Sequence, residues 1–456
     1  MRTAPLLLAA ALGVAAAPAV AHTVRVPASG GALATALATV ASGDTLVLAS
    51  GTHVGPVRVE HAVTLRGEPG AIVDGGGRGT VIEVTAPGAV LEDLAVRASG
   101  RRVITIDSGV RVLNAPGVRV RRVRASDVLY GVYAERSDGI VVEECELAGR
   151  VPPMTETGEG NGIHLWYTRD ALLRRNRVSR FMDAIYLSFA EGAHAEGNRL
   201  EGNGRYGFHT MYCQAGVLTA NTFAHNVAGC AVMFSNHLRV AGNLFQHNRG
   251  PRTYGLLLRD CSDGAFTDNR LVDNTIAVFM DNSNRNRLTG NLVQDNGWGV
   301  LLYSSCAGNV FAANSFINDE YPVALDMRRT DNRFDDGRRG NYWSENTAYD
   351  LDGDGVSDAP WSPVSAFAFL SKQYPDLSVL AKSPAVAALG VAERVFPALR
   401  ASEAVDRFPL VSPPHAAGAA GRAPRPARAP ARGALLGFCG LLGVGALGLA
   451  RRGSAR

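Results

Sequence analysis

Apolar and polar residues alternate in short runs along most of the chain, and turn-forming residues separate the runs. The stretches 44–60, 63–77 and 80–84 show this alternation near the N-terminus, and it continues to about residue 345. A period of two is typical of β-strands with one buried face. Helical spacing begins only near residue 366. The pattern therefore predicts an all-β protein with short helices near its C-terminal end.

Asparagine residues recur at a nearly fixed interval. Steps of 22, 23, 22, 26, 22 and 23 residues separate Asn176, Asn198, Asn221, Asn243, Asn269, Asn291 and Asn314. A second asparagine follows five residues later, at Asn203, Asn226, Asn248, Asn274 and Asn296. Such a period indicates a solenoid, in which asparagine suits the bends and stacked amides can bond from coil to coil. We predict a right-handed parallel β-helix over residues 22–345, with three short strands in each coil.

A column of small residues sets the register of these coils. Each member precedes a predicted strand: Gly131, Gly162, Ala184, Gly207, Gly229, Gly255, Ala277 and Gly299. The first and third residues after them are nearly all apolar and are predicted to face the core, so the second and fourth face outward. Adjacent strands lie about 4.8 Å apart, so outward residues form a continuous surface. We call its central part the outer patch, which comprises His164, Trp166, Tyr186, His209, Met211 and Met233.

The outer patch combines imidazole and thioether groups, which Cu(I) prefers. The copper ligand candidates are His209, Met211, Met233 and His164, with Met154 and Cys213 as further candidates. Met154 belongs to the segment 150–161, which interrupts the repeat and is predicted to project beside the patch. The alternative is an apolar docking surface, since methionine and aromatic residues are common at interfaces. Trp166 and Tyr186 would then contact a partner.

The N-terminus has the features of a signal peptide over residues 1–21. An apolar run ends near Ala17, and Ala19-Val20-Ala21 provides a small-x-small cleavage site. This predicts an exported, periplasmic protein whose first mature residue is His22. The amine and imidazole of that residue would offer a chelate for Cu(II). The cysteines of the predicted folded part show no framework spacing and are predicted to be mostly buried.

The C-terminal part changes in composition several times. An Asp/Gly-rich capping loop (346–365) precedes a helical segment (366–411), a Pro/Ala/Arg linker (412–433), an apolar segment (434–450) and a basic tail (451–456). The apolar segment is near the lower length limit for crossing a bilayer, and the arginines after it suit the cytoplasmic side. We predict a membrane anchor at the inner membrane, with a removable sorting segment as the alternative.

Two carboxylate groups suggest other chemistry. Asp350, Asp352, Asp354 and Asp358 are spaced like the first part of an EF-hand calcium loop, but position 12 is Trp361 and lacks the usual glutamate. A weak calcium site and plain solvated carboxylates both remain open. Arg259 and Asp281 are predicted to face outward on neighbouring coils and to pair, with Asp260 beside them. A glycan-acting enzyme on this fold would depend on such acids. The net charge of +4, without a basic stripe, does not predict nucleic-acid binding.

Several motifs together resemble the NosD family of nitrous oxide reductase maturation proteins, over about residues 24–413. They are YGFHTMY (206–212), AGCAVMFS (228–235), NRGPRTYGLLLRDC (248–261), DNSNRNR (281–287), GNYW (340–343), DLDGDGVSDAPWSPVS (350–365) and SPAVAALGVAERVFP (383–397).

The resemblance implies a non-enzymatic accessory protein that handles copper, as Cu(I), outside the cytoplasm. Its implied partners are the permease and ATPase of an ABC transporter, a copper chaperone lipoprotein and the apoprotein of nitrous oxide reductase. It also implies that His209, Met211 and Met233 contact copper. The region after the β-helix would contact the permease, with Leu389 and Phe396 on the docking face. The linker and the apolar segment extend beyond the family pattern.

Overall fold

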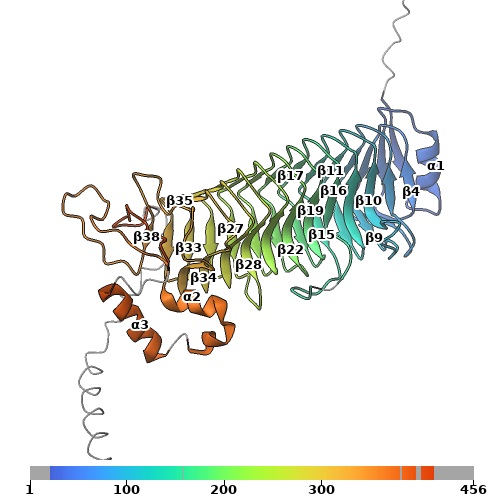
Figure 1. Cartoon of the computed structure of the whole chain (residues 1–456). Coiled ribbons are helices and arrows are strands. Elements are labelled where there is room, and N and C mark those ends of the chain that lie inside the picture. Colours follow the sequence, from blue (N-terminus) through green and yellow to red (C-terminus); the bar gives the residue numbers. More distant parts are fainter. Residues whose placement is uncertain (1–20, 157, 381–382, 397–401, 415–456) are drawn as a thin grey trace, which may run out of the picture. The chain divides into compact units, whose positions relative to one another are not determined.

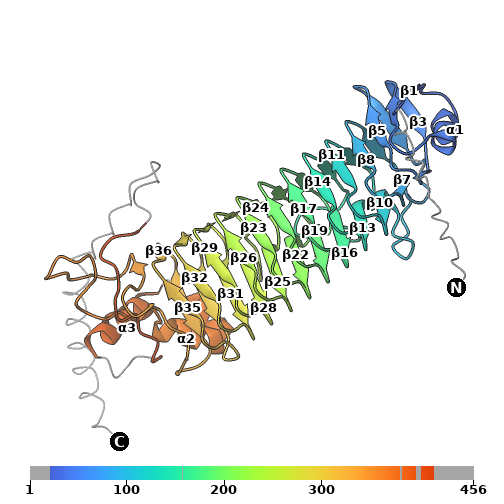
Figure 2. The same cartoon turned by 90° about the horizontal axis from the view of Figure 1, so that it is seen from above.

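The computed structural model describes residues 21–156, 158–380, 383–396 and 402–414. In this part of the chain, strands wind into a right-handed parallel β-solenoid whose coils stack along one axis (Figures 1 and 2). Each regular coil contributes one strand to each of three sheets, as the spacing of the asparagines predicts. Helix α1 (Ala32–Thr39) packs at the N-terminal end of the solenoid, against β1, β3 and β4.

Sheet A contains 13 strands, which are β1 (Thr23–Val26), β2 (Thr45–Leu48), β5 (Thr64–Gly67), β8 (Val90–Glu92), β11 (Arg119–Arg121), β14 (Val141–Glu143), β17 (Leu172–Arg174), β20 (His194–Glu196), β23 (Val217–Thr219), β26 (Arg239–Ala241), β29 (Ala265–Thr267), β32 (Arg287–Thr289) and β35 (Val310–Ala312). Sheet B also contains 13 strands, which are β3 (Gly51–Val54), β6 (Ala71–Asp74), β9 (Ala95–Arg97), β12 (Arg124–Ser126), β15 (Glu146–Ala148), β18 (Arg177–Ser179), β21 (Arg199–Glu201), β24 (Thr222–Ala224), β27 (Leu244–Gln246), β30 (Arg270–Val272), β33 (Leu292–Gln294), β36 (Ser315–Ile317) and β38 (Tyr342–Trp343). Sheet C contains 12 strands, which are β4 (Val57–Val59), β7 (Ile82–Val84), β10 (Ser108–Leu113), β13 (Tyr130–Glu135), β16 (Ile163–Trp166), β19 (Asp183–Ser188), β22 (Tyr206–Met211), β25 (Ala228–Met233), β28 (Tyr254–Arg259), β31 (Ile276–Asp281), β34 (Trp298–Leu302) and β37 (Tyr321–Leu325).

Sheet C has the predicted register. Tyr186 pairs with His209, and Met211 pairs with Met233 on the next coil. The residues expected to face inward on these strands, such as Phe208 and Cys230, are fully buried in the core. The prediction that the second and fourth positions share the opposite face of the sheet is therefore confirmed.

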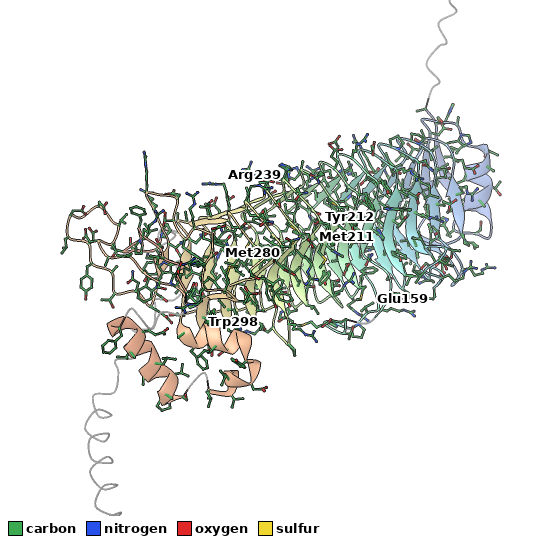
Figure 3. The ribbon with its side chains drawn as sticks, viewed as in Figure 1. Glu159, Met211, Tyr212, Arg239, Met280 and Trp298 are labelled. Carbon is green, nitrogen blue, oxygen red and sulfur yellow. The ribbon has the colours of Figure 1, made fainter. Side chains whose placement is uncertain are left out.

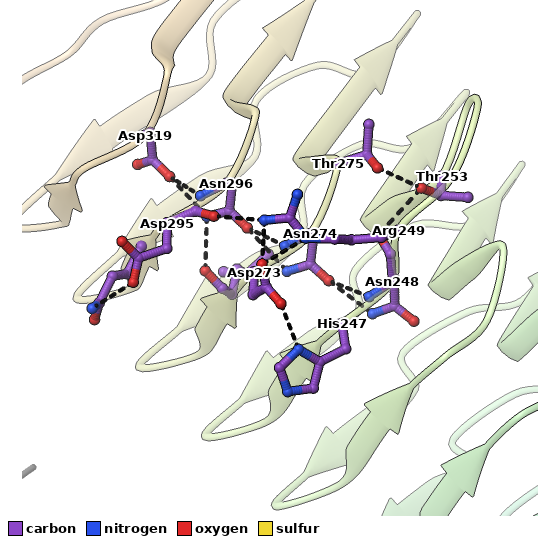
Figure 4. A network of polar contacts seen from close by, with 12 residues as sticks. His247, Asn248, Arg249, Thr253, Asp273, Asn274, Thr275, Asp295, Asn296 and Asp319 are labelled. Carbon is purple, nitrogen blue, oxygen red and sulfur yellow. Dashed lines mark hydrogen bonds and ion pairs between the residues drawn. The ribbon is translucent and has the colours of Figure 1, made fainter.

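The asparagine series form continuous ladders of amides inside the solenoid. In most steps of the ladders, the Oδ1 atom of an asparagine accepts both the main-chain N–H and the side-chain Nδ2–H of the asparagine one coil earlier. Asn296 accepts these two bonds from Asn274 at 2.8 and 3.1 Å (Figure 4). The Nδ2 atom of Asn274 also donates to the carbonyl of Phe245, one coil back, at 3.0 Å. These side chains are buried, so each amide satisfies polar groups that water cannot reach. The structural role predicted for these asparagines is thus confirmed.

The segment around Asp406 closes the C-terminal end of the solenoid. The Oδ2 atom of Asp406 accepts hydrogen bonds from the main chain of Asn341 at 2.7 Å and from Nε1 of Trp343 at 2.8 Å. Burial raises the pKa of Asp406 to about 6, against the effect of these hydrogen bonds. Leu410 then adds a parallel bridge beside Tyr342.

The segment predicted to be helical over 366–411 is only partly so. It contains α2 (Ala366–Gln373), a 3₁₀ helix (Pro375–Leu380) and α3 (Pro384–Val395). Ser365 and Ser383 cap the two α-helices through their side-chain oxygens. Residues 402–411 are not helical and belong to the cap, because they pair with the last coil through main-chain hydrogen bonds.

None of the helices in the described residues is both long and apolar enough to cross a membrane. The predicted signal peptide, except for Ala21, lies outside the described residues, as do the apolar segment 434–450, the basic tail and nearly all of the linker.

Candidate metal site on the outer face of sheet C

The outer patch lies midway along the solenoid, on the face of sheet C that points away from the core. Met211 is half-buried there, with Tyr212 beside it, whereas Trp298 lies several coils further on (Figure 3). The patch therefore has the place that the register predicts. Its members differ in burial and in their contacts, and these differences decide which of them can bind a ligand together.

His209 is on the expected face, but it is 5% exposed, because neighbouring aromatic rings enclose it. The ring of Tyr186 stacks on its imidazole at a centroid distance of 4.6 Å, and Tyr206 meets it edge-on at 5.0 Å. His209 is therefore part of the outer face but is not itself exposed on it. Its outward side chain is covered by Tyr186 of the preceding coil and by Tyr206 of its own strand.

A buried carboxylate fixes the orientation of His209. The Nδ1 atom of His209 lies 3.0 Å from Oδ2 of Asp183, which is completely buried and starts strand β19. Arg205 donates two further hydrogen bonds to Asp183, at 2.9 and 2.7 Å. Burial alone would raise the pKa of Asp183, but the hydrogen bonds from His209 and Arg205 outweigh it and hold the pKa below its usual range. Asp183 is therefore ionised.

The ionised carboxylate determines which imidazole nitrogen carries the proton. An ionised carboxylate only accepts hydrogen bonds, so Nδ1 of His209 is the donor. In the neutral imidazole, Nε2 is then the nitrogen with the lone pair that can bind a metal ion. Among the described residues, Nε2 is buried and has no hydrogen-bond partner. A carboxylate that orients one nitrogen and leaves the other free is the usual arrangement behind a metal-binding histidine.

Two thioethers complete the set of soft donors near His209. Met211 is two residues further along the same strand, and Met233 is its register partner on the next coil. The Tyr186 hydroxyl donates to Sδ of Met211 at 3.5 Å, which places this sulfur beside the ring that stacks on His209. One imidazole nitrogen and two thioether sulfurs fit Cu(I) better than a hard cation. The residues present therefore fit the group that the sequence suggests.

His164 is separated from His209 by the ring of Tyr186, which stands 4.6 Å from each imidazole. Burial lowers the pKa of His164 to about 4, against the opposing effect of the negative charge of Asp183. His164 is thus neutral at physiological pH. It lies two strands from His209 in sheet C, with Tyr186 between them, so the two histidines cannot bind the same ion. His164 contacts Asn161 instead, with 3.3 Å between Nδ1 and the amide nitrogen.

The structure places neither of two further ligand candidates beside the side chain of Met211. The main chain of Met154 donates to the carbonyl of Asn203, before the start of β22, whereas Met211 ends that strand about 17 Å further on. Cys213 is 3% exposed and belongs to the core. The reason is the left-handed backbone of Tyr212 (φ 57°), which turns the chain so that Cys213 points inward. Burial also raises the pKa of the Cys213 thiol.

A ridge of aromatic rings next to Met211 and Met233 was not predicted. Tyr167, Phe189, Tyr212 and Phe234 stack with centroid distances of 4.7, 5.0 and 5.0 Å. All four are exposed, by 36% to 47%, and all have left-handed backbones at the same corner of successive coils. Contiguous apolar surface of this kind is typical of an interaction site. The sequence contains the signal, since the fifth residue after the small-residue column is aromatic in these four coils.

The structure brings three of the four candidate calcium ligands together. Carboxylate oxygens of Asp350, Asp352 and Asp358 lie within 4.8 Å of one another. Asp354 accepts a hydrogen bond from the main chain of Val356 instead. The carboxylates of Asp350 and Asp358 also accept hydrogen bonds from main-chain N–H groups of the same loop.

The acids of the alternative enzyme hypothesis are each engaged with a different partner. Asp281 lies 3.5 Å from Arg259, as the sequence suggests, and Asp260 accepts a hydrogen bond from Asn282. These contacts suit structural carboxylates on the surface of a solenoid.

The predicted docking residues lie in two separate places. Trp166 contacts the end of the aromatic ridge at Tyr167, with 5.3 Å between the rings, and Tyr186 is enclosed between two imidazoles. Leu389 is half-buried on α3, and Phe396, at the end of that helix, is 60% exposed.

A family model described as "Periplasmic copper-binding protein (NosD)" matches residues 150–348. The chain is 32% identical to a "Probable ABC transporter binding protein NosD" of Pseudomonas aeruginosa, over 81% of this chain and 88% of that protein. It is 28% identical to a protein of the same description from Stutzerimonas stutzeri, over 80% and 86% of the two chains. The fold is similar to that of a PL6 alginate lyase bound to a trisaccharide, with a TM-score of 0.55 and 13% identity over 69% of this chain and 85% of that one.

Proposed function

The chain belongs to the NosD family, and from this premise we propose that it is a periplasmic copper-binding accessory protein that works with an ABC transporter. In this proposal it is a carrier, not an enzyme, and copper is its cargo. The finer role is to help assemble the copper–sulfur centre of nitrous oxide reductase, with copper received from a lipoprotein chaperone.

One observation carries the proposal. His209 presents a buried, unpartnered Nε2 atom, and the ionised carboxylate of Asp183 holds its ring in place. Two thioethers lie on the same face of sheet C as His209. Met211 is two residues further along the strand, and Met233 pairs with Met211 on the next coil. Such a set binds Cu(I) without needing an anionic ligand, so the ion can leave when a stronger donor approaches.

The two sulfurs give this site an open side. Met211 and Met233 are half-buried, and the residue that follows each of them, just after the strand ends, belongs to the exposed aromatic ridge. An ion held by His209 can therefore be reached from the direction of the ridge. We place the partner that exchanges copper on that side.

The helices after the solenoid are the proposed contact with the permease. Leu380 and Phe396 are exposed by 49% and 60%, and α2 packs on the last strand of sheet C. Cross-links between Phe396 and the permease would support this contact. Cross-links confined to the N-terminal coils would contradict it.

Replacing His209 and Met211 together by alanine should weaken Cu(I) binding by roughly 100-fold or more, because the imidazole and one of two thioethers are lost. The measurement is an anaerobic titration of the full exported chain against a competing Cu(I) chelator. His225→Ala is the matched control, because it removes an exposed histidine from a turn outside the patch. Copper binding by the double variant equal to that of the parent protein would exclude the outer patch as the site.

Replacing Asp183 by asparagine should lower the Cu(I) affinity by about 10- to 100-fold, although Asp183 does not touch the ion. The asparagine amide has nearly the same size as the carboxylate. It no longer fixes the Nδ1-protonated form of His209, and it does not balance the positive charge of Arg205. NMR of ¹⁵N-labelled histidine would report the change of tautomer, which a purely structural role of Asp183 would not produce. Asp260→Asn removes a carboxylate from a later coil and should leave both measurements unchanged.

A further inference from the structure

The N-terminal edge of the solenoid brings together three potential metal ligands, far along the chain from the outer patch. The main-chain nitrogen of His22 donates a hydrogen bond to Oδ1 of Asp44 at 2.8 Å. The Nδ1 atom of the same histidine lies 3.6 Å from that oxygen. The His22 side chain is 73% exposed, whereas that of Asp44 is 10% exposed. The carboxylate is therefore held by the fold, and the imidazole stands in solvent.

The surrounding sheet holds both residues in place. Strand β1 begins directly after His22, and the carbonyl of His22 accepts a hydrogen bond from Thr45 at 2.8 Å. The other oxygen of Asp44 accepts the main-chain N–H of Ala41 at 3.0 Å. The approach of His22 to Asp44 thus follows from the pairing of β1 with β2 and does not depend on a long flexible side chain.

Removal of the predicted signal peptide changes the chemistry of this contact. Ala21 and His22 are both exposed, so the bond after the small-x-small sequence is open to a peptidase. Before cleavage the nitrogen of His22 is an amide and a poor ligand. After cleavage it is an α-amine, which forms a six-membered chelate ring with Nδ1 of its own imidazole. Two ligand atoms about 2.0 Å from a metal ion and at right angles are about 2.8 Å apart, close to the observed N–Oδ1 distance.

We propose that export of the protein creates a Cu(II) site from the α-amine and Nδ1 of His22 and the carboxylate of Asp44. Two nitrogens and one oxygen suit the tetragonal geometry of Cu(II), whereas the outer patch offers soft donors for Cu(I). Without metal, the α-ammonium group pairs with Asp44. Binding of Cu(II) displaces one proton from that group and transfers the carboxylate to the metal ion.

The test uses the full chain exported to the periplasm. Mass spectrometry first establishes the N-terminal residue of each variant, and Cu(II) is then added without reductant and followed by electron paramagnetic resonance. We expect one equivalent of Cu(II) with an axial spectrum and nitrogen couplings. His22→Ala should lower the affinity by at least 100-fold, and Asp44→Asn should lower it by about tenfold with a changed spectrum.

Two controls separate this site from others. His61→Ala removes another exposed histidine near the N-terminal edge, and the double replacement of His209 and Met211 removes the outer patch; both should leave the Cu(II) spectrum unchanged. A mature chain that begins at a residue other than His22 would overturn the proposal. Equal Cu(II) binding by His22→Ala and the parent protein would also overturn it. Because His22 is exposed, that variant tests the site even if Asp44→Asn does not fold.

Discussion

Replacing Asn243 by alanine should lower the free energy of unfolding by about 4 kcal/mol, because several buried polar groups lose their partner at once. The Oδ1 atom of Asn243 accepts the main-chain and side-chain N–H groups of Asn221, both at 2.9 Å. Its Nδ2 atom donates to the carbonyl of Leu218 at 2.9 Å and to Oδ1 of Asn269 at 3.0 Å. Asn243 is 1% exposed, so water cannot replace these bonds. Guanidinium unfolding followed by circular dichroism would measure the effect.

The expected loss depends on the position of Asn243 in the ladder and not on the amide alone. Gln214→Ala removes an exposed carboxamide at a corner of a neighbouring coil, and it should change stability by less than about 0.5 kcal/mol. Equal effects of the two substitutions would show that coil-to-coil amide bonding contributes little, and that apolar packing of the coils alone supports the solenoid.

The solenoid and the register of sheet C were predictable because both depend on local regularities. Alternation decides which residues face inward, and the spacing of the asparagines gives the length of each coil. The residues Phe208 and His209 were thus assigned correctly to opposite faces of β22. The non-helical cap at Asp406 was not predictable in this way, since it depends on pairing with a strand 63 residues earlier.

The environment of His209 was only partly predictable from the sequence. Its burial results from the rings of Tyr186 and Tyr206, which depend on side-chain directions that an alternation pattern does not contain. Asp183 did leave a signal. Asp183 directly precedes the small residue of its coil. In most other coils this position is aromatic or aliphatic, as at Tyr206 and Ile276. A charged residue there requires partners, which Arg205 and His209 provide.

The position of Cys213 shows a different limit. Strict alternation would place the Cys213 side chain on the same face as those of His209 and Met211. The left-handed backbone of Tyr212 bends the chain, so the Cys213 side chain points into the core instead. The same left-handed conformation recurs at Tyr167, Phe189 and Phe234. None of these residues is a glycine or an asparagine, the residue types that usually indicate it. Backbone bends at aromatic residues are uncommon, so alternation alone could not turn the Cys213 side chain into the core. The ridge did leave a signal, since an aromatic residue recurs at the fifth position after the small residue in four successive coils.

Asp319→Asn should stabilise the protein above pH 7 by up to about 4 kcal/mol, and have little effect near pH 4. Asp319 takes the place of the next asparagine in the second ladder, where its Oδ1 atom accepts two hydrogen bonds from Asn296 (Figure 4). Its Oδ2 atom is buried and has no hydrogen-bond partner among the described residues. Burial raises the pKa of this carboxyl to about 7, against the effect of the bonds from Asn296.

The sign of the pH effect follows from this raised pKa. Between pH 3.8 and about 7, the folded protein keeps a proton on Asp319 that the unfolded chain has lost, so the stability of the parent protein falls as the pH rises through this range. An asparagine at position 319 carries no charge, and its Nδ2 atom would reach the carbonyl of Val293, just as Asn296 reaches that of Leu271. Unfolding midpoints from pH 4 to pH 8 would measure the difference, with Asp170→Asn, which removes an exposed carboxylate from a distant coil, as the charge-matched control. A difference between parent and Asp319→Asn that stays constant over this range would mean that Asp319 does not titrate in the folded protein. The ladder would then end in a permanently charged residue, and its last coil would need a cation to hold it.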